Sequence, residues 1–363
     1  MRIRSYTPPR SHPPQEANPA TPPLPYPDGW FCVGFSTEWP PGTVHTRPFM
    51  GEDLVIYRTR SGKLRASRPY CPHLGAHLGA GGKVDGEQLV CPFHKFSFDT
   101  EGKCVQTPFG PPPKASLTFV KLTEAYGIVW AWHHHNDDTP TWELPELGLT
   151  DGHPPLFKGT DMAGHPQEVC ENSFDYGHIQ PLHGVEFLGE LAPPREDGQL
   201  YHVEIKINRK LPLLGTRQHN ASATVIGLGG ISVVVNLPEF GVYSVNWVLA
   251  TPIAPWRIRL YLAVSAHVTW GRNSPALVRT PVSNAAARAV SAGILKALEQ
   301  DIRRDFPMWH HKRYVEHPKL SRADGLIGTF RKWAGQFYAP PTGKDPSPRT
   351  GSSLPHGDLE RSR

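Results

Sequence analysis

Two short segments near residue 80 combine cysteine and histidine at a regular spacing. The first contains Cys71 and His73, and the second contains Cys91 and His94, with seventeen residues between His73 and Cys91. Each segment supplies one thiolate and one imidazole, and both groups are ligands for transition metals. The pattern therefore predicts a metal centre held by two cysteines and two histidines.

Two kinds of centre use this set of ligands. Structural zinc sites accept two cysteines and two histidines, but zinc fingers usually group cysteine with cysteine and histidine with histidine. Here each segment mixes the two types. That arrangement fits a Rieske [2Fe-2S] cluster, in which two cysteines hold one iron and two histidines hold the other. We therefore predict a Rieske cluster as the cofactor on Cys71, His73, Cys91 and His94, with structural zinc as the alternative.

A second stretch with ligand-type side chains covers residues 171–184 and contains Asp175, His178 and His183. Asp175 and His178 are three residues apart and would share one face of a helix. His178 and His183 are five residues apart, so a regular α-helix would leave them about 140° out of phase. They can meet at one metal only if the helix ends or widens between them. Pro181 lies at that point and predicts such an interruption.

A carboxylate is needed to complete this second site, because two imidazoles and one carboxylate form the facial triad that binds Fe(II) and leaves positions open for O2. Asp175 is the nearest acid, and Glu299, Asp301 and Asp305 compete from a long helix predicted over about 282–306. Asp305 lies on the apolar stripe of that helix, whereas Glu299 and Asp301 do not. An acid that faces a core is rarely unpaired. We therefore favour Asp305, with an Asp305–arginine ion pair as the alternative.

Two further segments contain residue types that are common in cofactor sites, but their predicted positions do not match such a site. The histidine run 133–135 follows a predicted strand, so we interpret it as a solvated strand end. Residues 227–230 read Gly-Leu-Gly-Gly, which falls short of the dinucleotide fingerprint and does not open a helix. We therefore expect no NAD or flavin domain, and electrons must come from a separate protein.

Composition and charge exclude other classes of protein. The net charge is +5 over 363 residues, of which residues 1–26 supply +2 (three Arg and one Glu) and residues 340–363 supply +1 (four cations and three acids). The remainder is nearly neutral and has no basic run with interleaved aromatics, so we exclude nucleic acid as a partner. Five cysteines without a regular framework indicate a reducing compartment. No apolar run is long enough for a transmembrane segment or a signal peptide, so we expect a cytoplasmic protein.

The order of turn residues and apolar runs predicts two domains. Short strands separated by turns indicate a small antiparallel β domain that holds both cysteine-histidine segments. A second domain follows, with alternating strands and a long helix. The predicted parts are a disordered proline-rich leader at 1–27, the β domain at 28–135, a surface linker at 136–165, the second domain at 166–339 and a disordered tail at 340–363.

With both motifs in view, the chain resembles the Rieske non-haem iron oxygenases from about residue 29 to residue 338. Both motifs occur in that family in this order and at this separation. Within the family, three segments look most like the steroid branch, meaning the cholesterol 7-desaturases of the Neverland type and the oxygenase component of 3-ketosteroid 9α-hydroxylase. These segments are Cys71–Ala76 with the Gly-Gly-Lys-Val that follows, Glu171–His178, and Asp305–Lys312 with the late 330–338.

The resemblance implies an α+β fold, in which an all-β Rieske domain precedes a catalytic domain of helix-grip, START-like architecture. It implies that His178, His183 and Asp305 bind a mononuclear Fe(II). Asp175 then matches the acid that connects the two metal centres, which is a catalytic role. In the family the subunits form a head-to-tail homotrimer, and the histidine matching His94 meets this acid across the interface. Lys95 is a departure, because many relatives have glycine there.

The resemblance also implies an activity. The chain would be the oxygenase component of a Rieske monooxygenase, using O2 and electrons from NAD(P)H delivered by a separate ferredoxin or ferredoxin reductase. It would hydroxylate, desaturate or oxidatively demethylate a hydrophobic polycyclic substrate, a sterol or steroid, in a pocket expected along the strands of 231–264. Oxidative tailoring or cyclisation of a polycyclic secondary metabolite is the alternative. An electron-transfer Rieske protein without a second iron is the alternative from another class.

Overall fold

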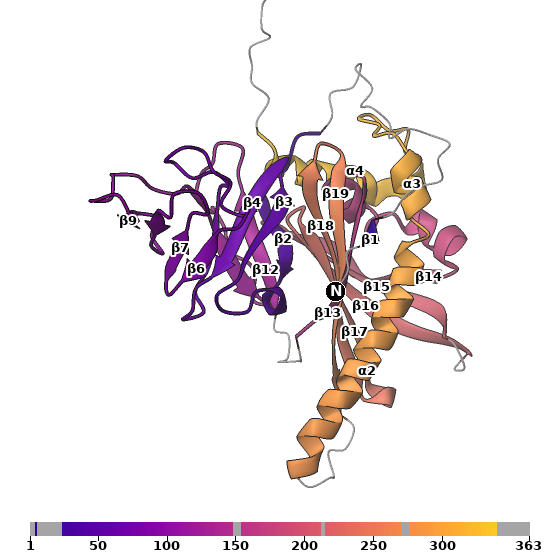
Figure 1. Ribbon diagram of the computed structural model, residues 1–363. Coiled ribbons are helices and arrows are strands. Elements are labelled where there is room, and N and C mark those ends of the chain that lie inside the picture. The colour runs from indigo at the N-terminus through magenta and orange to yellow at the C-terminus, as the bar shows by residue number, and fades with distance from the viewer. Residues whose placement is uncertain (1–3, 6–23, 148–153, 212–214, 270–275, 340–363) are drawn as a thin grey trace, which may run out of the picture.

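Two β-rich regions lie side by side in the computed structural model (Figure 1), which describes residues 4–5, 24–147, 154–211, 215–269 and 276–339. The smaller region is formed by residues 29–133 and the larger one by residues 156–338. This is the predicted order of an all-β domain followed by a domain with an antiparallel sheet and helices. Residues 6–23 and 340–363, where most of the leader and the tail were expected, lie outside the described residues.

The smaller region consists of short antiparallel strands in three sheets. Their strand orders are β10-β5-β4-β3, β11-β12-β2 and β6-β7-β8-β9. The last of these sheets lies at the outer end of the region, at the left of Figure 1, and the cysteine-histidine segments flank its strands. The elements are β2 (Gly29–Phe35), the 3-10 turn η1 (Ser36–Glu38), β3 (Val44–Phe49), β4 (Glu52–Arg58), β5 (Leu64–Ser67), β6 (Lys83–Asp85), β7 (Gln88–Val90), β8 (Ser97–Phe98), β9 (Cys104–Gln106), β10 (Phe119–Val120), β11 (Leu122–Ala125) and β12 (Ile128–His133).

The larger region is built on one sheet with the order β1-β13-β19-β18-β17-β16-β15-β14. Seven of these strands pair antiparallel, and β1 adds to the edge in parallel. The strands are β1 (Arg4–Ser5), β13 (Leu156–Ala163), β14 (Glu186–Asp197), β15 (Leu200–Leu211), β16 (Gly215–Ile226), β17 (Gly230–Leu237), β18 (Val242–Ala254) and β19 (Arg257–Val268).

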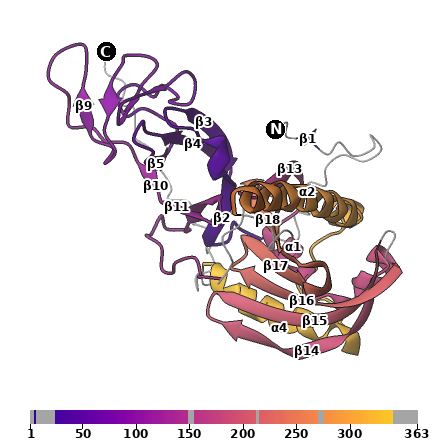
Figure 2. The same cartoon turned by 90° about the horizontal axis from the view of Figure 1, so that it is seen from below.

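Helices cover one face of this sheet. Figure 2 shows α2 over the β13–β18 end of the sheet and α4 at its β14–β15 end, which is the expected helix-grip arrangement. No helix among the described residues is long and apolar enough to cross a membrane. The helical elements are α1 (Pro166–Glu171), the 3-10 turn η2 (Tyr176–His178), the π turn η3 (Ile179–His183), η4 (Pro238–Phe240), α2 (Ala276–Ile302), α3 (Phe306–His311), η5 (Arg322–Asp324), α4 (Gly325–Ala334) and η6 (Gly335–Phe337).

The opposite face of the sheet packs against the smaller region. Successive side chains of a strand point to opposite faces, and in β18 both faces are buried. Val248 and Ala250 join the core that contains the helices, whereas Trp247 and Leu249 join a second core that contains Trp130 of β12. The sheet is therefore a wall shared by the two regions.

The predicted linker 136–165 is wrong in its second half, because Leu156–Ala163 form β13 inside the sheet. Lys158 and Asp161 interrupt the apolar pattern of this strand, which hid it in the sequence. Both charges are compensated only by tertiary contacts, through ion pairs to Glu299 and Arg259, respectively.

The predicted disordered leader 1–27 is also wrong in two places. Arg4–Ser5 pair with the edge of β13, where backbone groups are free to bond a further strand. Near residue 27, His165 makes a hydrogen bond to the carbonyl oxygen of Pro25 at 3.1 Å, and Tyr26 packs against the core of the smaller region. These short polar or proline-rich pieces gain their order from the surfaces on which they lie.

Candidate metal centres

The two cysteine-histidine segments form two loops that close in the same way. The Cys71 N–H donates to the carbonyl oxygen of Ala76 at 2.9 Å, and the Cys91 N–H donates to that of Phe96 at 2.8 Å. Both cysteines are buried, whereas His73 is exposed. The repeated closure therefore directs two thiols toward the core and leaves imidazole near the surface.

Within this pair of loops, thiol meets thiol and imidazole meets imidazole. The Cys71 and Cys91 side chains are in contact, and burial raises the pKa of the Cys71 thiol to about 11. The His73 and His94 ring centroids are 4.8 Å apart, and Phe96 stacks on His73 at 4.2 Å. The four side chains do not converge on one point. They are not among the groups, found in the described part of the chain, whose ligand atoms all lie within 4.8 Å of one another. Two separate pairs fit a two-iron cluster better than a single zinc.

Lys95 occupies the place in the second loop that Gly75 occupies in the first. Each stands four residues after the loop's cysteine, and the φ angles are 59° for Lys95 and 71° for Gly75. A left-handed backbone costs a residue with a side chain about 1–2 kcal/mol. The Lys95 ammonium donates to the carbonyl oxygen of Pro92 at 2.8 Å, so it is bound within its own loop.

The segment between His178 and His183 widens, as the five-residue spacing required. Ile179–His183 form the π turn η3, and Gly184 ends it with a φ of 66°. A π turn closes its hydrogen bonds over five residues, so side chains five apart return to nearly the same face. The ring centroids of His178 and His183 are accordingly 5.2 Å apart.

Asp305 reaches the same point from the turn between α2 and α3. Its side chain is only 3% exposed, and Oδ1 lies 3.3 Å from Nε2 of His183 and 3.9 Å from Nε2 of His178. Asn172 Nδ2 donates to this Oδ1 at 3.4 Å, whereas Oδ2 is buried without a hydrogen-bond partner. A buried carboxylate oxygen without a partner is unfavourable, and a divalent metal would compensate it. These residues therefore fit a mononuclear iron.

The turn that carries Asp305 interrupts the helix predicted over 282–306. α2 ends at Ile302 and α3 begins at Phe306, with Pro307 in its first turn. Proline has no N–H, and its ring clashes with the carbonyl four residues earlier, so the helix cannot continue through Pro307. The orientation of Asp305 is nevertheless kept, because its N–H donates to the carbonyl oxygen of Ile302 at 3.1 Å in a tight turn.

The competing acids of α2 have other partners. Glu299 pairs with Lys158 and Arg303, and Asp301 pairs with Arg209. These ion pairs account for both carboxylates, and neither belongs to the group formed by the two histidines and Asp305. No ion pair to arginine or lysine is found for Asp305 within the described part of the chain, which removes the support for that alternative.

Asp175 lies directly beside the first histidine of the triad. Its Oδ1 accepts the His178 N–H at 3.3 Å, and Nδ1 of His178 lies 2.5 Å from the main-chain oxygen of Asp175. The hydrogen bond to His178 lowers the pKa of Asp175, so the group is a carboxylate at neutral pH. Its side chain remains 35% exposed, which leaves it accessible from outside the chain. Its role as the connecting acid stays a prediction.

Arg304 is a functional candidate that the sequence did not reveal. Its guanidinium donates to the carbonyl oxygens of His183 at 2.9 Å and Leu182 at 3.4 Å. It thereby ties the end of the π turn to the residue before Asp305. In sequence, Arg304 is one of several cations near the end of the predicted helix, and its partners are main-chain atoms more than a hundred residues away.

A second group of histidines and carboxylate, Asp28 with His134 and His135, also has converging atoms. Both oxygens of Asp28 already accept hydrogen bonds from His135, from N–H and from Nδ1, each at 2.7 Å. His134 is 3.3 Å from Asp138. Because this carboxylate is satisfied, the group fits a hydrogen-bonded strand end rather than a metal site.

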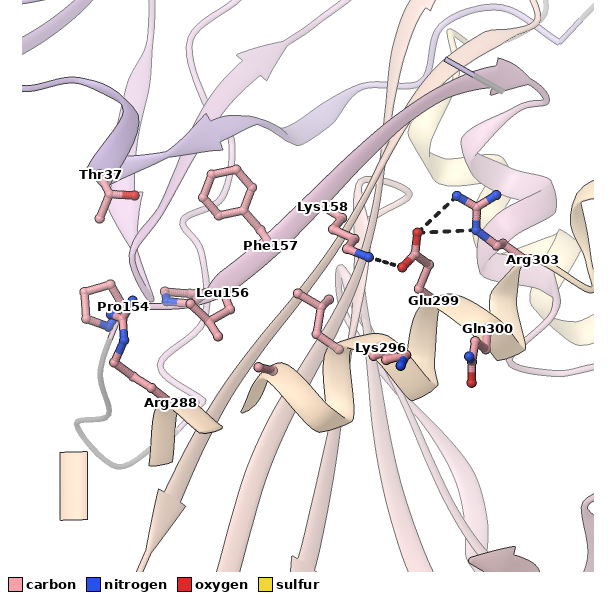
Figure 3. A pocket seen from close by; sticks show the side chains of 13 residues that line it. Thr37, Pro154, Leu156, Phe157, Lys158, Arg288, Lys296, Glu299, Gln300 and Arg303 are labelled. Atoms are coloured by element: carbon pink, nitrogen blue, oxygen red, sulfur yellow. Dashed lines mark hydrogen bonds and ion pairs between the residues drawn. The ribbon is translucent and has the colours of Figure 1, made fainter. Parts of the chain in front are cut away.

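The chain contains a cavity of about 820 Å³ that lies away from the triad (Figure 3). Its lining comes mainly from β13 and α2, with no residue from the strands of 231–264 and none of the triad. The apolar substrate pocket expected along those strands therefore stays a prediction.

Comparison with known families decides the class of protein. Residues 29–122 match the Rieske [2Fe-2S] domain, and residues 131–338 match the 3-ketosteroid 9α-hydroxylase C-terminal domain. The chain belongs to the Rieske non-haem iron oxygenases. It is thus an oxidoreductase of a family that combines a [2Fe-2S] cluster with a mononuclear iron and takes its electrons from a separate reductase.

Three relatives resemble this Rieske oxygenase over most of its length. Cholesterol 7-desaturase of Bombyx mori is 31% identical over 342 residues, covering 87% of this chain and 70% of the relative. The corresponding desaturase of Xenopus laevis is also 31% identical, covering 88% of this chain and 73% of the relative. A probable 3-ketosteroid-9-alpha-monooxygenase oxygenase component of Rhodococcus rhodochrous is 28% identical, covering 88% and 81%.

Solved structures share the fold at lower identity. NdmA of Pseudomonas putida with caffeine superposes with a TM-score of 0.62 at 19% identity, covering 84% of this chain and 89% of that one. Dicamba monooxygenase with non-heme iron and dicamba gives a TM-score of 0.58 at 17% identity, covering 85% and 96%. Both similarities concern the architecture alone.

Proposed function

We propose that this Rieske oxygenase hydroxylates, desaturates or oxidatively demethylates a hydrophobic polycyclic substrate, and that the substrate is a sterol or steroid. The observation that carries the oxygenase role is the buried Asp305 carboxylate, whose Oδ1 lies beside two imidazoles and whose Oδ2 has no hydrogen-bond partner. An electron-transfer protein has no use for such a group. The substrate class is supported by relatives named as cholesterol 7-desaturase and 3-ketosteroid-9-alpha-monooxygenase.

The chain's residues take separate roles in this proposal. The mononuclear iron supplies O2 activation at its open coordination positions. Asp175 accepts a hydrogen bond from Nδ1 of His178 through its main-chain oxygen, which fixes the tautomer whose Nε2 is free for a metal. The proposed cluster ligands are Cys71, His73, Cys91 and His94, and the proposed iron ligands are His178, His183 and Asp305.

We also infer that the chains assemble head to tail as a homotrimer in which electrons pass between subunits. The β6–β9 sheet that carries the cluster loops and the α3–β14 side that carries the triad lie at opposite ends of the chain (Figure 1). Large apolar side chains are exposed at both ends, and burying them against a neighbouring chain would favour this assembly. The first set is Tyr70, Leu74, Phe93, Val105 and Phe109, and the second is Leu188, Leu191, Met308, Val315 and Leu320.

The oxygenase role is tested by Asp305→Ala, with Asp301→Ala, four residues earlier near the end of α2, as the matched control. The purified proteins are assayed for mononuclear iron, for cluster absorbance, and for O2 uptake with a reductase and a panel of sterols and steroids. Asp305→Ala should lose the mononuclear iron and turnover while keeping the cluster. If only Asp301→Ala loses the iron, the ligand assignment is wrong, and product from non-steroidal polycycles alone would refute the steroid assignment.

Transfer between subunits is tested by mixing two inactive chains. One carries Cys91→Ala and lacks the cluster, and the other carries His183→Ala and lacks the iron. If they are co-expressed and assemble at random, about one quarter of the interfaces join an intact cluster to an intact iron, and activity should recover to that level. Activity that stays at background although mixed assemblies form would contradict the proposal.

A further inference from the structure

The cavity between α2 and β13 is an elongated cleft at the junction of the two domains. Figure 3 shows Arg288 and Thr37 toward one end and Arg303 at the other. The helical wall from Arg288 to Arg303 is about 22 Å long at 1.5 Å per residue. Thr37 belongs to η1 of the Rieske domain, so both domains contribute to the lining.

The floor of the cleft is apolar and lies where the sheet edge is open. β1 pairs with β13 only at Thr160 and Asp161, so the described strands leave the edge at Leu156–Lys158 uncovered. Phe157 stacks on Phe35 of the Rieske domain, with ring centroids 3.9 Å apart and an interplanar angle of 11°. This stacking holds the floor in place between the two domains.

The walls of the cleft carry an excess of positive charge. The lining contains four cations and one carboxylate, Glu299, which Lys158 and Arg303 already share. Figure 3 draws these contacts as dashed lines. Arg288 and Lys296 are exposed, and neither has an ion-pair partner among the described residues. Two uncompensated cations therefore stand beside an apolar floor.

We propose that this cleft is a second ligand site, which binds an elongated amphipathic anion such as a long-chain carboxylate. The apolar chain would lie over Leu156 and Leu295, the carboxylate would bind Arg288 at one end of the cleft, and Lys296 would add to the positive potential along it. A volume of about 820 Å³ is within the range of small-molecule sites, and concave apolar sites with a few charged groups are typical of them. Because no triad residue lines the cleft, the site is independent of the proposed oxygenase chemistry.

The test uses the full-length protein and dodecanoate below its micelle concentration, with binding measured by calorimetry. Dodecanoate should bind one per chain, and dodecan-1-ol, which lacks the charge, should bind about tenfold more weakly. Lys296→Glu and Arg288→Glu should each weaken dodecanoate binding about tenfold, and added salt should weaken it further. Ala292→Trp fills the cleft and should abolish binding, with thermal melting confirming that the variant folds.

Two controls separate this site from others. Arg217→Glu makes the same charge change at an exposed residue of β16 and should leave dodecanoate binding unchanged, as should His183→Ala in the triad. If His183→Ala abolishes binding, dodecanoate occupies the oxygenase site and the proposal is wrong. It is also wrong if dodecan-1-ol binds equally well, or if dodecanoate does not bind at all. In the latter case, loss of binding of an acidic electron-transfer protein in the cleft variants would assign the cleft to that partner.

Discussion

The cluster loops and the triad position their ligand-type side chains in different ways. The four proposed cluster ligands come from residues 71–94 and are held by main-chain hydrogen bonds inside each loop. The triad joins the π turn at 179–183 to Asp305, and its parts are brought together by packing of α2 and α3 onto the sheet and by the hydrogen bonds of Arg304 to the π turn. The first centre depends on local backbone geometry, and the second depends on the whole catalytic domain.

This difference predicts that either metal centre can be lost while the other stays loaded. Cys91→Ala should remove the cluster and reduce turnover to background, because no electrons reach the iron. The same variant should keep its mononuclear iron, since no part of the triad rests on the loop. Metal analysis and visible absorbance check both statements. Loss of the mononuclear iron together with the cluster would show that the two centres are coupled in folding.

A smaller but specific effect is expected at the π turn. Pro181→Ala allows Ile179–His183 to return to regular α-helical bonding, which turns His183 away from His178. Iron affinity should fall about tenfold or more, with the cluster unchanged. Pro238→Ala, in the 3-10 turn η4, is the matched control and should leave iron binding intact. An unchanged iron titration in Pro181→Ala would mean that packing alone, and not proline, sets the wide turn.

The contact between the two ligand-bearing segments predicts a moderate effect. Arg304→Gln removes the charge-assisted hydrogen bonds to the carbonyl oxygens of Leu182 and His183. Iron affinity should fall about three- to tenfold, because the shorter of these bonds, to His183, contributes about 1 kcal/mol and the longer one adds little. Arg303→Gln, one residue earlier, loses its bonds to Glu299 and its cation–π contact with Phe306 but no bond to the π turn, and it should bind iron normally. Equal losses in both variants would reduce Arg304 to a general stabilising residue.

The smallest effect concerns backbone strain in the cluster loops. Lys95→Gly relieves a positive φ, and after the greater chain entropy of glycine is subtracted, the free energy of unfolding should rise by about 0.5 kcal/mol. Gly75→Ala, at the matching place, should lower it by about 1 kcal/mol. Denaturant midpoints measure both. Lys95→Ala keeps the strain but removes the bond to Pro92, and if it stabilises as much as Lys95→Gly, strain is not the cause.

How far the sequence could predict each centre follows from the same comparison. The cluster loops are local, so spacing and residue type were sufficient to indicate Cys71, His73, Cys91 and His94 as candidate ligands. The triad could be predicted because two local features of the sequence point to it. Pro181 marked the wide turn, and the apolar stripe of the late helix distinguished Asp305 from its neighbours. Family resemblance then added the connecting role predicted for Asp175.

Features that depend on distant contacts were not predictable in this way. β13 was taken for linker because its charges at Lys158 and Asp161 are compensated only by residues about a hundred or more positions later. The contact of Arg304 with main-chain oxygens has no sequence signal at all. The cleft is formed jointly by the edge of β13, the side of α2 and a turn of the other domain, so no single segment of the sequence predicts it.

The sheet that both domains share has a consequence for how electrons can travel. Trp130 and Trp247 meet across the junction with ring centroids 6.2 Å apart, and Thr251 donates to the carbonyl oxygen of Cys32 at 2.6 Å. A wall this well packed leaves no hinge by which the cluster could swing toward its own iron. Under the head-to-tail proposal, dilution becomes an off switch: chains diluted below the dissociation constant of the assembly stay folded and metal-loaded, yet turnover stops.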